Sequence, residues 1–530
     1  MTDPAADARP PSARSGALFV AVGIFLSRLV GLVRQRVVAQ YFGLGMEADA
    51  WSAAFRIPNV LQNLFGDQAL SASFIPVYAA LLARGERREA DRVAGAVAAL
   101  LALIVAILVI VGVFATPWLI ALIAPGFTGE KRELTTRLVR ILFPGAGLLV
   151  LSAWCLGVLN SHHRFLLSYT APIAWNVAMI ATLVLFGHGT PLPRLAVILA
   201  WGSVVGSTLQ FVVQVPIVVR VAPDLRFAID TASAHVRAVA TNFVPVFVSR
   251  GVVQLSAYVD QLLASLLGTG AVAALTNAQT LSTLPVSLFG VAVSAAELPA
   301  MAGMARGETD GYEALRRRLD AGLRQIALFV VPSAVAFLAL GDVVAAAIFE
   351  TGRFTHADAM YVWAILAGSA VGLLASTLGR LYSSTYYALR DTRTPLNYAI
   401  IRVVLTTVLG YVFAFPLPRV LGIAAMWGAA GLTASAGLAG WVEMFLLRSK
   451  LNARIGRTGL PANYVMKLWA SACTAAAIGW AIKLAIPTVP PVPMAILVLG
   501  PYGLGFFGAA LALQIPEAST AFRRLIRPRR

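Results

Sequence analysis

The stretch VAGAVAALLALIVAILVIVGVFATPWLIAL, residues 93–122, contains no charged side chain. A helix needs about 20 apolar residues to cross the hydrocarbon core of a bilayer, so this segment is long enough to span a membrane. Similar runs recur along all 530 residues, and the chain is 59% hydrophobic and only 12% charged. Because soluble domains carry about 25% charged residues, the composition predicts a polytopic membrane protein.

The apolar runs predict an all-α fold with about fourteen transmembrane helices. The predicted spans lie near residues 17–41, 48–83, 93–122, 134–159, 165–187, 194–219, 238–267, 270–303, 319–340, 357–387, 395–416, 420–447, 463–487 and 493–515.

Basic residues are concentrated in the loops on one side of the membrane. Arg84, Arg87, Arg88 and Arg92 share one such loop, Arg316–Arg318 lie in another, and the C-terminal tail adds more. By the positive-inside rule, this bias places both termini in the cytoplasm. The net charge of +18 therefore reflects topology and contact with anionic lipid rather than nucleic-acid binding.

The chain repeats itself at an offset near 222 residues. Several short matches occur in the same order in both copies: FLSR (25–28) with FVSR (247–250), LFG (64–66) with LFG (288–290), ARGE (83–86) with ARGE (305–308), LGVLNS (156–161) with LGRLYS (378–383), and NVAMI (176–180) with NYAII (397–401). An even number of spans per copy relates the halves by an axis along the membrane normal, and such transporters bind substrate between the halves.

The repeat predicts the domain organisation. We expect a cytoplasmic N-terminal tail at 1–16 and a basic cytoplasmic tail at 516–530. Between them lie a six-helix lobe at 17–222, a second at 235–448, and two additional transmembrane helices at 460–515.

The first predicted span contains three arginines, Arg28, Arg34 and Arg36. An arginine at the centre of a membrane helix costs roughly 2.5–3.5 kcal/mol, so such residues usually face a cavity or a partner. Arg250 occupies the position of Arg28 in the second repeat. An excess of guanidinium groups in one cavity favours an anionic ligand such as a phosphate. The alternative is internal ion pairing, for example of Arg28 with Asp67.

Proline and glycine interrupt the equivalent spans of both repeats. Pro58 and Pro76 flank Gly66 in the first copy, and Pro285 and Pro299 flank Gly290 in the second. Such residues mark bends or unwound turns near transport sites, or static packing kinks.

Catalytic and redox motifs are missing from the sequence. No lysine follows a glycine, which excludes a phosphate-binding loop, and no hydrolase or metalloprotease motif is found. The two cysteines, Cys155 and Cys473, are far apart in apolar runs. We therefore expect no enzyme activity and no cofactor, and transport driven by an ion gradient or the membrane potential.

Residues 23–79, GIFLSRLVGLVRQRVVAQYFGLGMEADAWSAAFRIPNVLQNLFGDQALSASFIPVYA, resemble the MurJ (MviN-like) family of the MOP exporter superfamily. Weaker similarity continues through LIAPGF (122–127), LPVSLFGVAVSAAELPAM (284–301) and LRDTRTPLNYAII (389–401). The resemblance implies an alternating-access flippase for lipid II, the undecaprenyl-pyrophosphate-linked peptidoglycan precursor. It also implies the bacterial cytoplasmic membrane and a role in cell-wall biogenesis and cell shape.

The resemblance also implies a substrate-binding cavity. Its predicted residues are Arg28, Arg34, Asp49, Arg56, Asp67 and Arg380, with Arg250 added from the repeat. Two positions depart from the family pattern, because Gln62 and Thr280 stand where well-known members have arginine. These departures leave open a different polyprenyl-pyrophosphate glycan as cargo.

Some family members bind sodium, and the matching positions here are Asp260, Asp391, Val403 through its carbonyl, and Thr407. A further asparagine ligand is replaced by Tyr387. Oxygen donors suit a hard cation. The alternative is that Asp260 pairs with an arginine and Asp391 caps a loop, with coupling to protons or the membrane potential.

Other functions remain open from the sequence. A drug or cation exporter of the same superfamily predicts acidic rather than basic spans, and a membrane scaffold or integral enzyme predicts no dependence on the cavity charges. The expected partners are the lipid-linked glycan, membrane lipids and cell-wall synthesis proteins.

Overall fold

The computed structural model describes residues 13–230, 232–291, 293–294, 297–298, 301, 309–486 and 489–520. Its described part is all-helical, with no β-sheet, and divides into two compact units, Met1–Leu262 and Leu263–Arg530. The all-α fold is thus confirmed. Ten helices are long and apolar enough to cross a membrane by length and composition, so the full count of fourteen stays a prediction.

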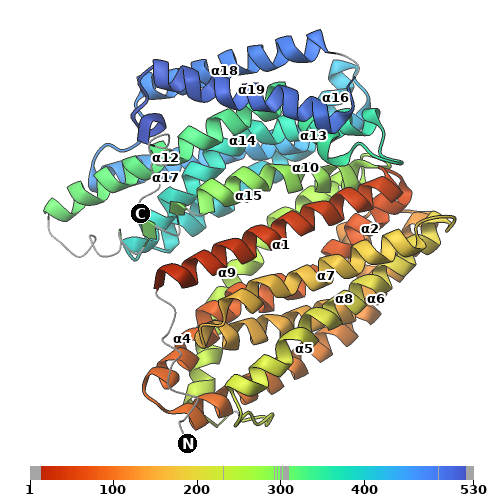
Figure 1. Cartoon of the computed structure of the whole chain (residues 1–530), viewed down its shortest axis with the longest axis vertical. Helices are drawn as coiled ribbons and strands as arrows, with labels where there is room; N and C mark the ends of the chain where they lie inside the picture. Colours follow the sequence, from red (N-terminus) through yellow and green to blue (C-terminus); the bar gives the residue numbers. More distant parts are fainter. Residues whose placement is uncertain are drawn as a thin grey trace, which may run out of the picture. The chain divides into compact units, whose positions relative to one another are not determined.

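Figure 1 labels the helices of the first unit. They are α1 (Ala13–Phe42), α2 (Met46–Arg56), α3 (Asn59–Phe65), α4 (Asp67–Ala83), α5 (Arg87–Ile123), α6 (Gly129–Ser161), α7 (Phe165–Phe186), α8 (Leu192–Val221) and α9 (Ala234–Ser265).

The second unit begins near the end of α9. It contains α10 (Ala271–Pro285), the π-helix η1 (Val286–Val291), α12 (Thr309–Ala339), α13 (Gly341–Phe349), α14 (His356–Ala388), α15 (Arg393–Ala414), α16 (Pro416–Leu421), the 3₁₀ turn η2 (Ala425–Trp427), α17 (Gly428–Ile455), α18 (Ala462–Ala485) and α19 (Pro491–Ala512).

The predicted span 48–83 is three helices rather than one. α2 ends before Pro58, which has no N–H to continue the helical ladder, and Gly66 separates α3 from α4. Gly66 is extended, and a Cβ there would lie 2.2 Å from the carbonyl oxygen of Gln62. The equivalent place in the second repeat, Pro285–Gly290, ends α10 and enters the π-helix. Both breaks fall where the proline and glycine pattern predicts them.

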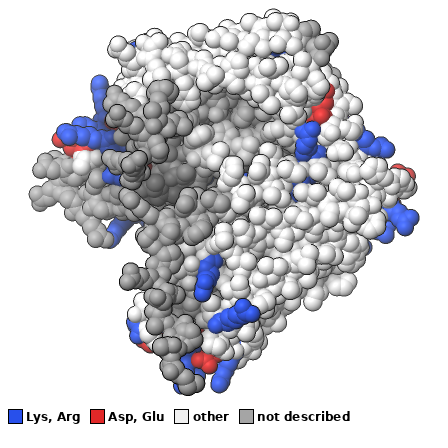
Figure 2. Space-filling model, viewed as in Figure 1, with Lys and Arg blue, Asp and Glu red and all other residues white. Residues whose placement is uncertain are grey.

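Small residues let the helices of each unit pack closely. A Cβ on Gly372 of α14 would lie 2.2 Å from the Cα of Gly437 on α17, so only glycine fits at this crossing. Such contacts drive helix association in lipid, where burial of apolar surface gains little. The outward faces stay apolar, as Phe114 and Trp118 of α5 show with about three-quarters of their surface exposed. On the face in Figure 2, most described surface carries no charged side chain.

A polar cluster holds one end of the first unit. The Tyr78 hydroxyl of α4 lies 2.9 Å from Nε2 of His162, which follows α6, and 3.5 Å from the carboxylate of Asp91 on α5. Asp91 also accepts the backbone N–H of Asp224, in the loop after α8. Burial, with the nearby charge of Arg87, lowers the pKa of His162. A neutral His162 therefore belongs to the folded arrangement.

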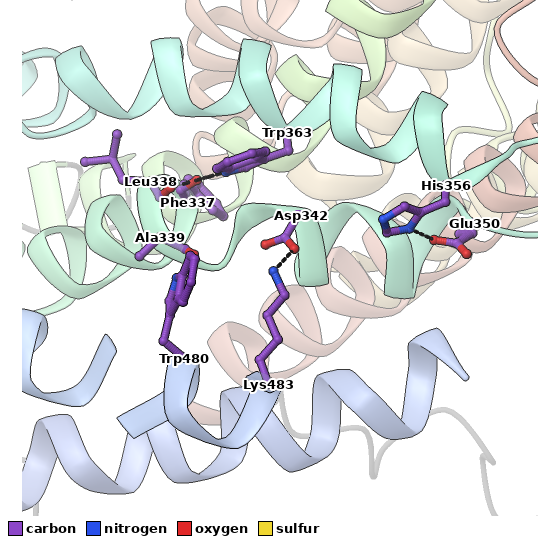
Figure 3. Close-up of polar contacts among 9 residues, drawn as sticks. All are labelled: Phe337, Leu338, Ala339, Asp342, Glu350, His356, Trp363, Trp480 and Lys483. Atoms are coloured by element: carbon purple, nitrogen blue, oxygen red, sulfur yellow. Dashed lines mark hydrogen bonds and ion pairs between the residues drawn. The ribbon is translucent and has the colours of Figure 1, made fainter. Parts of the chain in front are cut away.

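The two C-terminal helices are fastened to α12 and α13 within the second unit. Figure 3 shows Lys483 of α18 paired with Asp342 of α13, whose side chain is buried, and the Trp480 indole N–H donating to the Ala339 carbonyl at 2.7 Å. Tyr464 of α18 donates to the Arg324 carbonyl, and Tyr502 of α19 to that of Pro332. These contacts bind the predicted extra helices firmly to the repeat.

Candidate functional site

Arg34 of α1 lies against two aromatic rings. Its guanidinium carbon is 5.0 Å from the ring centre of Trp175 on α7 and 5.4 Å from that of Phe55 on α2. Both distances are within the range of cation–π attraction, which grows stronger as the cation loses water. Among the side chains that the structure describes, no carboxylate pairs with Arg34. Its charge is therefore held in place without being neutralised.

The aromatic platform is itself fixed. The Phe55 and Trp175 rings stack with centres 5.5 Å apart. The Trp175 indole N–H donates to the carbonyl and hydroxyl oxygens of Ser203 on α8, at 3.2 and 3.1 Å. Gly206 gives the indole room, since a Cβ there would lie 2.8 Å from Cδ1 of Trp175. The Arg34 side chain thus lies on a rigid surface made by α2, α7 and α8.

A cavity of about 230 Å³ lies beside Arg34, within the first unit. Besides Arg34, its lining is neutral and mostly polar or small: Ser27, Gly31, Gln62, Leu149, Ser152, Leu156, Ser168, Pro172, Trp175, Asn176 and Gln210. Among the described side chains, none that lines it is acidic. Gln62, one of the two departures from the family pattern, is part of this wall.

Two glutamines of α8 brace the far wall of the cavity. Gln210 and Gln214 both donate through Nε2 to the Ser152 hydroxyl of α6, at 3.0 and 2.5 Å. Both are buried, and their amide oxygens have no hydrogen-bond partner, as is also true of the Asn176 amide oxygen. Such orphan acceptors are rare in folded proteins and call for an explanation.

The predicted cavity residue Asp49 is fully buried. Its carboxylate lies 2.5 Å from the ammonium of Lys131 on α6, and that ammonium also lies 4.1 Å from the Phe127 ring centre. Nothing in the sequence marks Lys131 as the partner of Asp49, because Lys131 lies in a predicted loop. The pair joins α2 to α6 where both helices begin.

Arg56 and Asp260 interact electrostatically within the first unit. Tyr258 of α9, two residues before Asp260, donates its hydroxyl to the Arg56 carbonyl at 3.1 Å. The interaction between Arg56 and Asp260 favours the alternative in which Asp260 has an arginine as its electrostatic partner. The hydrogen bond from Tyr258 joins the end of α2 to α9.

The other predicted cavity residues are placed less fully. Arg28 is exposed on α1, and Arg380 is exposed on α14. Asp67 begins α4 and Arg250 lies in α9, but both side chains lie outside the described residues. The structure therefore groups Arg34 with Gln62, and leaves the larger arginine cavity as a prediction.

Three of the four predicted sodium ligands lie in the second unit. Asp391 accepts the backbone N–H and the hydroxyl of Thr394, at 3.0 and 2.8 Å, so it caps the start of α15. The Thr394 N–H lowers the pKa of Asp391. Thr407 donates its hydroxyl to the Val403 carbonyl at 2.9 Å. Asp260 belongs to the first unit, so the joint site stays a prediction.

Thr280 and Tyr387 stand where members of the family have an arginine and an asparagine. Thr280 donates its hydroxyl to the Thr276 carbonyl within α10, and Tyr387 is exposed near the end of α14. No cluster of three or more His, Cys, Asp or Glu side chains occurs among the residues described.

Sequence reasoning missed Trp175, Phe55 and the α8 glutamines. The repeat match at 176–180 lies in α7 but begins one residue after Trp175 and does not include it. A run of small and polar residues in an apolar span, such as Gly202–Gln214 in α8, is the signal that could have found this wall.

Comparison with known proteins identifies the family. A family model described as "Lipid II flippase MurJ" matches residues 38–507. The lipid II flippase MurJ of Burkholderia cenocepacia is 33% identical over 435 residues, covering 81% of this chain and 82% of that protein. The probable lipid II flippase MurJ of Vibrio cholerae is 28% identical over 440 residues, with 81% of each chain covered.

Solved structures agree on the fold. A lipid II flippase MurJ in an inward closed conformation matches with a TM-score of 0.76 at 24% identity, covering 96% of this chain and all of that one. An inward-facing MATE multidrug transporter of the MOP superfamily matches with a TM-score of 0.65 at 18% identity, covering 83% of this chain and 98% of that one. By its sequence, and with a fold to match, this multi-pass membrane protein belongs to the MurJ family of lipid II flippases.

Proposed function

We propose that this protein moves lipid II, or a closely related polyprenyl-diphosphate glycan, from the inner to the outer leaflet of the bacterial cytoplasmic membrane. It acts as a transporter rather than an enzyme, with both termini in the cytoplasm. Membership of the MurJ family supports the cargo class. One observation of the site carries the proposal: Arg34 is held beside a polar cavity with no carboxylate among its described neighbours.

The chemistry of Arg34 fits a diphosphate. A guanidinium offers several N–H donors in a planar fork that matches phosphate oxygens, and hydrogen bonds to ionised groups contribute roughly 1.5–3 kcal/mol each. Arg28 lies nearer the start of α1. Together with Arg34 it could form two or more such bonds, which would offset much of the free-energy cost of desolvating the headgroup. The lipid tail stays in the bilayer, so only the headgroup needs a polar path.

A cation exporter is the second candidate, since MATE transporters share the fold. The described lining of the cavity beside Arg34 is cationic and neutral, with no acidic group among its described residues. A cationic drug would be repelled there, so this observation favours an anionic cargo. We further propose that transport is coupled to sodium through Asp260 and Asp391, to protons, or to the membrane potential. The proposal also includes contact with cell-wall synthesis proteins.

The test is replacement of the native flippase in a conditional bacterial strain, together with lipid II transport by the purified protein in vesicles. We expect Arg28→Ala and Arg34→Ala to abolish growth and transport at normal protein levels, and Arg34→Lys to restore transport in part. Arg36→Ala is the matched control on the same helix, with a milder effect, because that side chain can extend toward the interface. Growth supported by Arg28→Ala and Arg34→Ala together would overturn the proposal.

A further inference from the structure

The cavity beside Arg34 has more polar groups than a diphosphate can use. Anionic oxygens accept hydrogen bonds and offer none, so they pair with Arg34 and with the serine hydroxyls of the wall. The amide oxygens of Asn176 and Gln210 are acceptors too, and neither has a partner. A ligand that satisfies them must bring its own donors, as a sugar does through hydroxyl and acetamido groups.

Cavity size limits the ligand further. A volume of about 230 Å³ equals the share of liquid water held by about seven or eight molecules, at roughly 30 Å³ each. That space holds one pyranose ring with short substituents, so a further sugar or a peptide of the same ligand would lie outside it. The sugar bonded directly to the diphosphate is the part of such a cargo that reaches Arg34 and the cavity together.

The wall is arranged for recognition at low entropic cost. Ser152 receives donors from both Gln210 and Gln214, which fixes Gln210 against α6. Asn176 is tied to α7 through its own donor to the Pro172 carbonyl at 2.9 Å, leaving the oxygen end of its amide unpaired. In each amide the nitrogen is thus already paired within the wall, and the oxygen is the end without a protein partner.

We propose that this cavity is a subsite for the first sugar of a polyprenyl-diphosphate glycan, with the diphosphate on Arg34 and the sugar donors on Asn176 and Gln210. The inference rests on the proposed function and adds where the protein distinguishes a glycosylated carrier from the bare one. Trp175 acts as a positioning residue, because it holds Arg34 at the mouth of the subsite.

Gln210 and Gln214 offer a matched pair of variants. They are the same residue type on the same helix with the same Ser152 partner, but only Gln210 lines the cavity. Gln210→Met and Gln214→Met each remove one buried amide of similar volume. Any loss of stability should therefore be shared, whereas a loss of sugar recognition should follow Gln210 alone.

The experiment measures binding of two lipids to the purified protein in nanodiscs: undecaprenyl diphosphate, and the same lipid carrying one N-acetylmuramoyl sugar. We expect the wild type and Gln214→Met to bind the glycosylated lipid at least about tenfold more tightly, and Gln210→Met to lose that preference to within about threefold, as one or two lost hydrogen bonds would give.

The outcomes separate the two proposals. Equal binding of both lipids by the wild type overturns the sugar subsite and leaves the diphosphate site intact. Equal loss of preference in Gln210→Met and Gln214→Met also overturns it, since the effect would then be structural. Binding of neither lipid by the wild type contradicts the proposed function itself.

Discussion

Asp49 and Lys131 illustrate, at the scale of single residues, how a mostly apolar chain keeps charges inside. The Asp49 side chain is fully buried and that of Lys131 is about one-tenth exposed. Two ions this close offset much of each other's desolvation, but each depends on the other. Replacing one member should therefore lower the stability of the protein more than replacing both.

Lys131→Met should lower the free energy of unfolding by about 3–5 kcal/mol, because it leaves a buried carboxylate without its counter-ion. The double variant Asp49→Asn with Lys131→Met should regain most of that loss. Thermal unfolding followed by tryptophan fluorescence in detergent measures both. A double variant as unstable as Lys131→Met would show that Asp49 is held by something other than this charge.

His162 gives the first unit a dependence on pH. Its pKa is lowered in the folded protein, so between that value and the ordinary one near 6.5 the unfolded chain binds more protons. Stability is therefore full above about pH 6.5 and is lost as the pH falls through this window. We expect a lower melting temperature at pH 5.5 than at pH 7.5.

The variant His162→Gln should flatten this dependence, since glutamine cannot gain the proton. His188→Gln, at an exposed position after α7, serves as the control and should keep the wild-type slope. Parallel melting curves for His162→Gln and the wild type would disprove the assignment.

At the scale of helices, the apolar runs determined what could be predicted. The predicted spans 395–416 and 463–487 differ from α15 and α18 by only about two residues at either end. Length and hydropathy suffice there because a bilayer imposes both. The short helices α13 and α16 lie wholly or partly between predicted spans, because nine and six residues are too few to cross a bilayer and a span-length window misses them.

The site was less predictable than the helices. Arg34 could be singled out because a charge in an apolar span is conspicuous, and the break at Gly66 because glycine and proline mark it. The Trp175 platform and the partner of Asp49 depend on contacts between helices far apart in sequence. An indole in an apolar run looks the same whether it faces lipid or an arginine.

Gly66 should tolerate no side chain. In Gly66→Ala the new Cβ meets the Gln62 carbonyl, a backbone atom that cannot move away without reshaping α3. We expect a loss of more than about 1 kcal/mol in stability and reduced transport. Gly440→Ala in α17 is the control: nothing lies within 4 Å of its Cβ, so it should be neutral or stabilising by about 0.5–1 kcal/mol. Equal effects of the two substitutions would argue against a built-in break.

At the scale of the whole molecule, the predicted membrane topology can be tested by labelling single cysteines introduced into a variant that lacks Cys155 and Cys473. Cysteines at Arg84 and Arg457, both exposed, should be shielded from an impermeant thiol reagent in intact cells because they lie in predicted cytoplasmic loops. Thr269 is the outward probe and should react. Thr269 is exposed in the loop after α9, whereas the adjacent Gly270 is buried with a positive φ of 90° and would be strained by a side chain.

Labelling of Arg84→Cys from outside would show that the assigned orientation is reversed. Labelling of all three positions would indicate leaky cells, so a cytoplasmic marker protein is probed in the same samples.

The fastening of α18 and α19 to α12 and α13 has a consequence for shortened forms of the protein. A chain ending near residue 460 would lack the Lys483 ammonium and the donors that Trp480, Tyr464 and Tyr502 supply. The Asp342 carboxylate would then lose the cation that pairs with it, and the carbonyls of Ala339, Arg324 and Pro332 would lose their donors, so we expect the truncated chain to be less stable. Although these two helices lie outside the predicted repeat, we therefore expect that the second unit cannot fold stably without them.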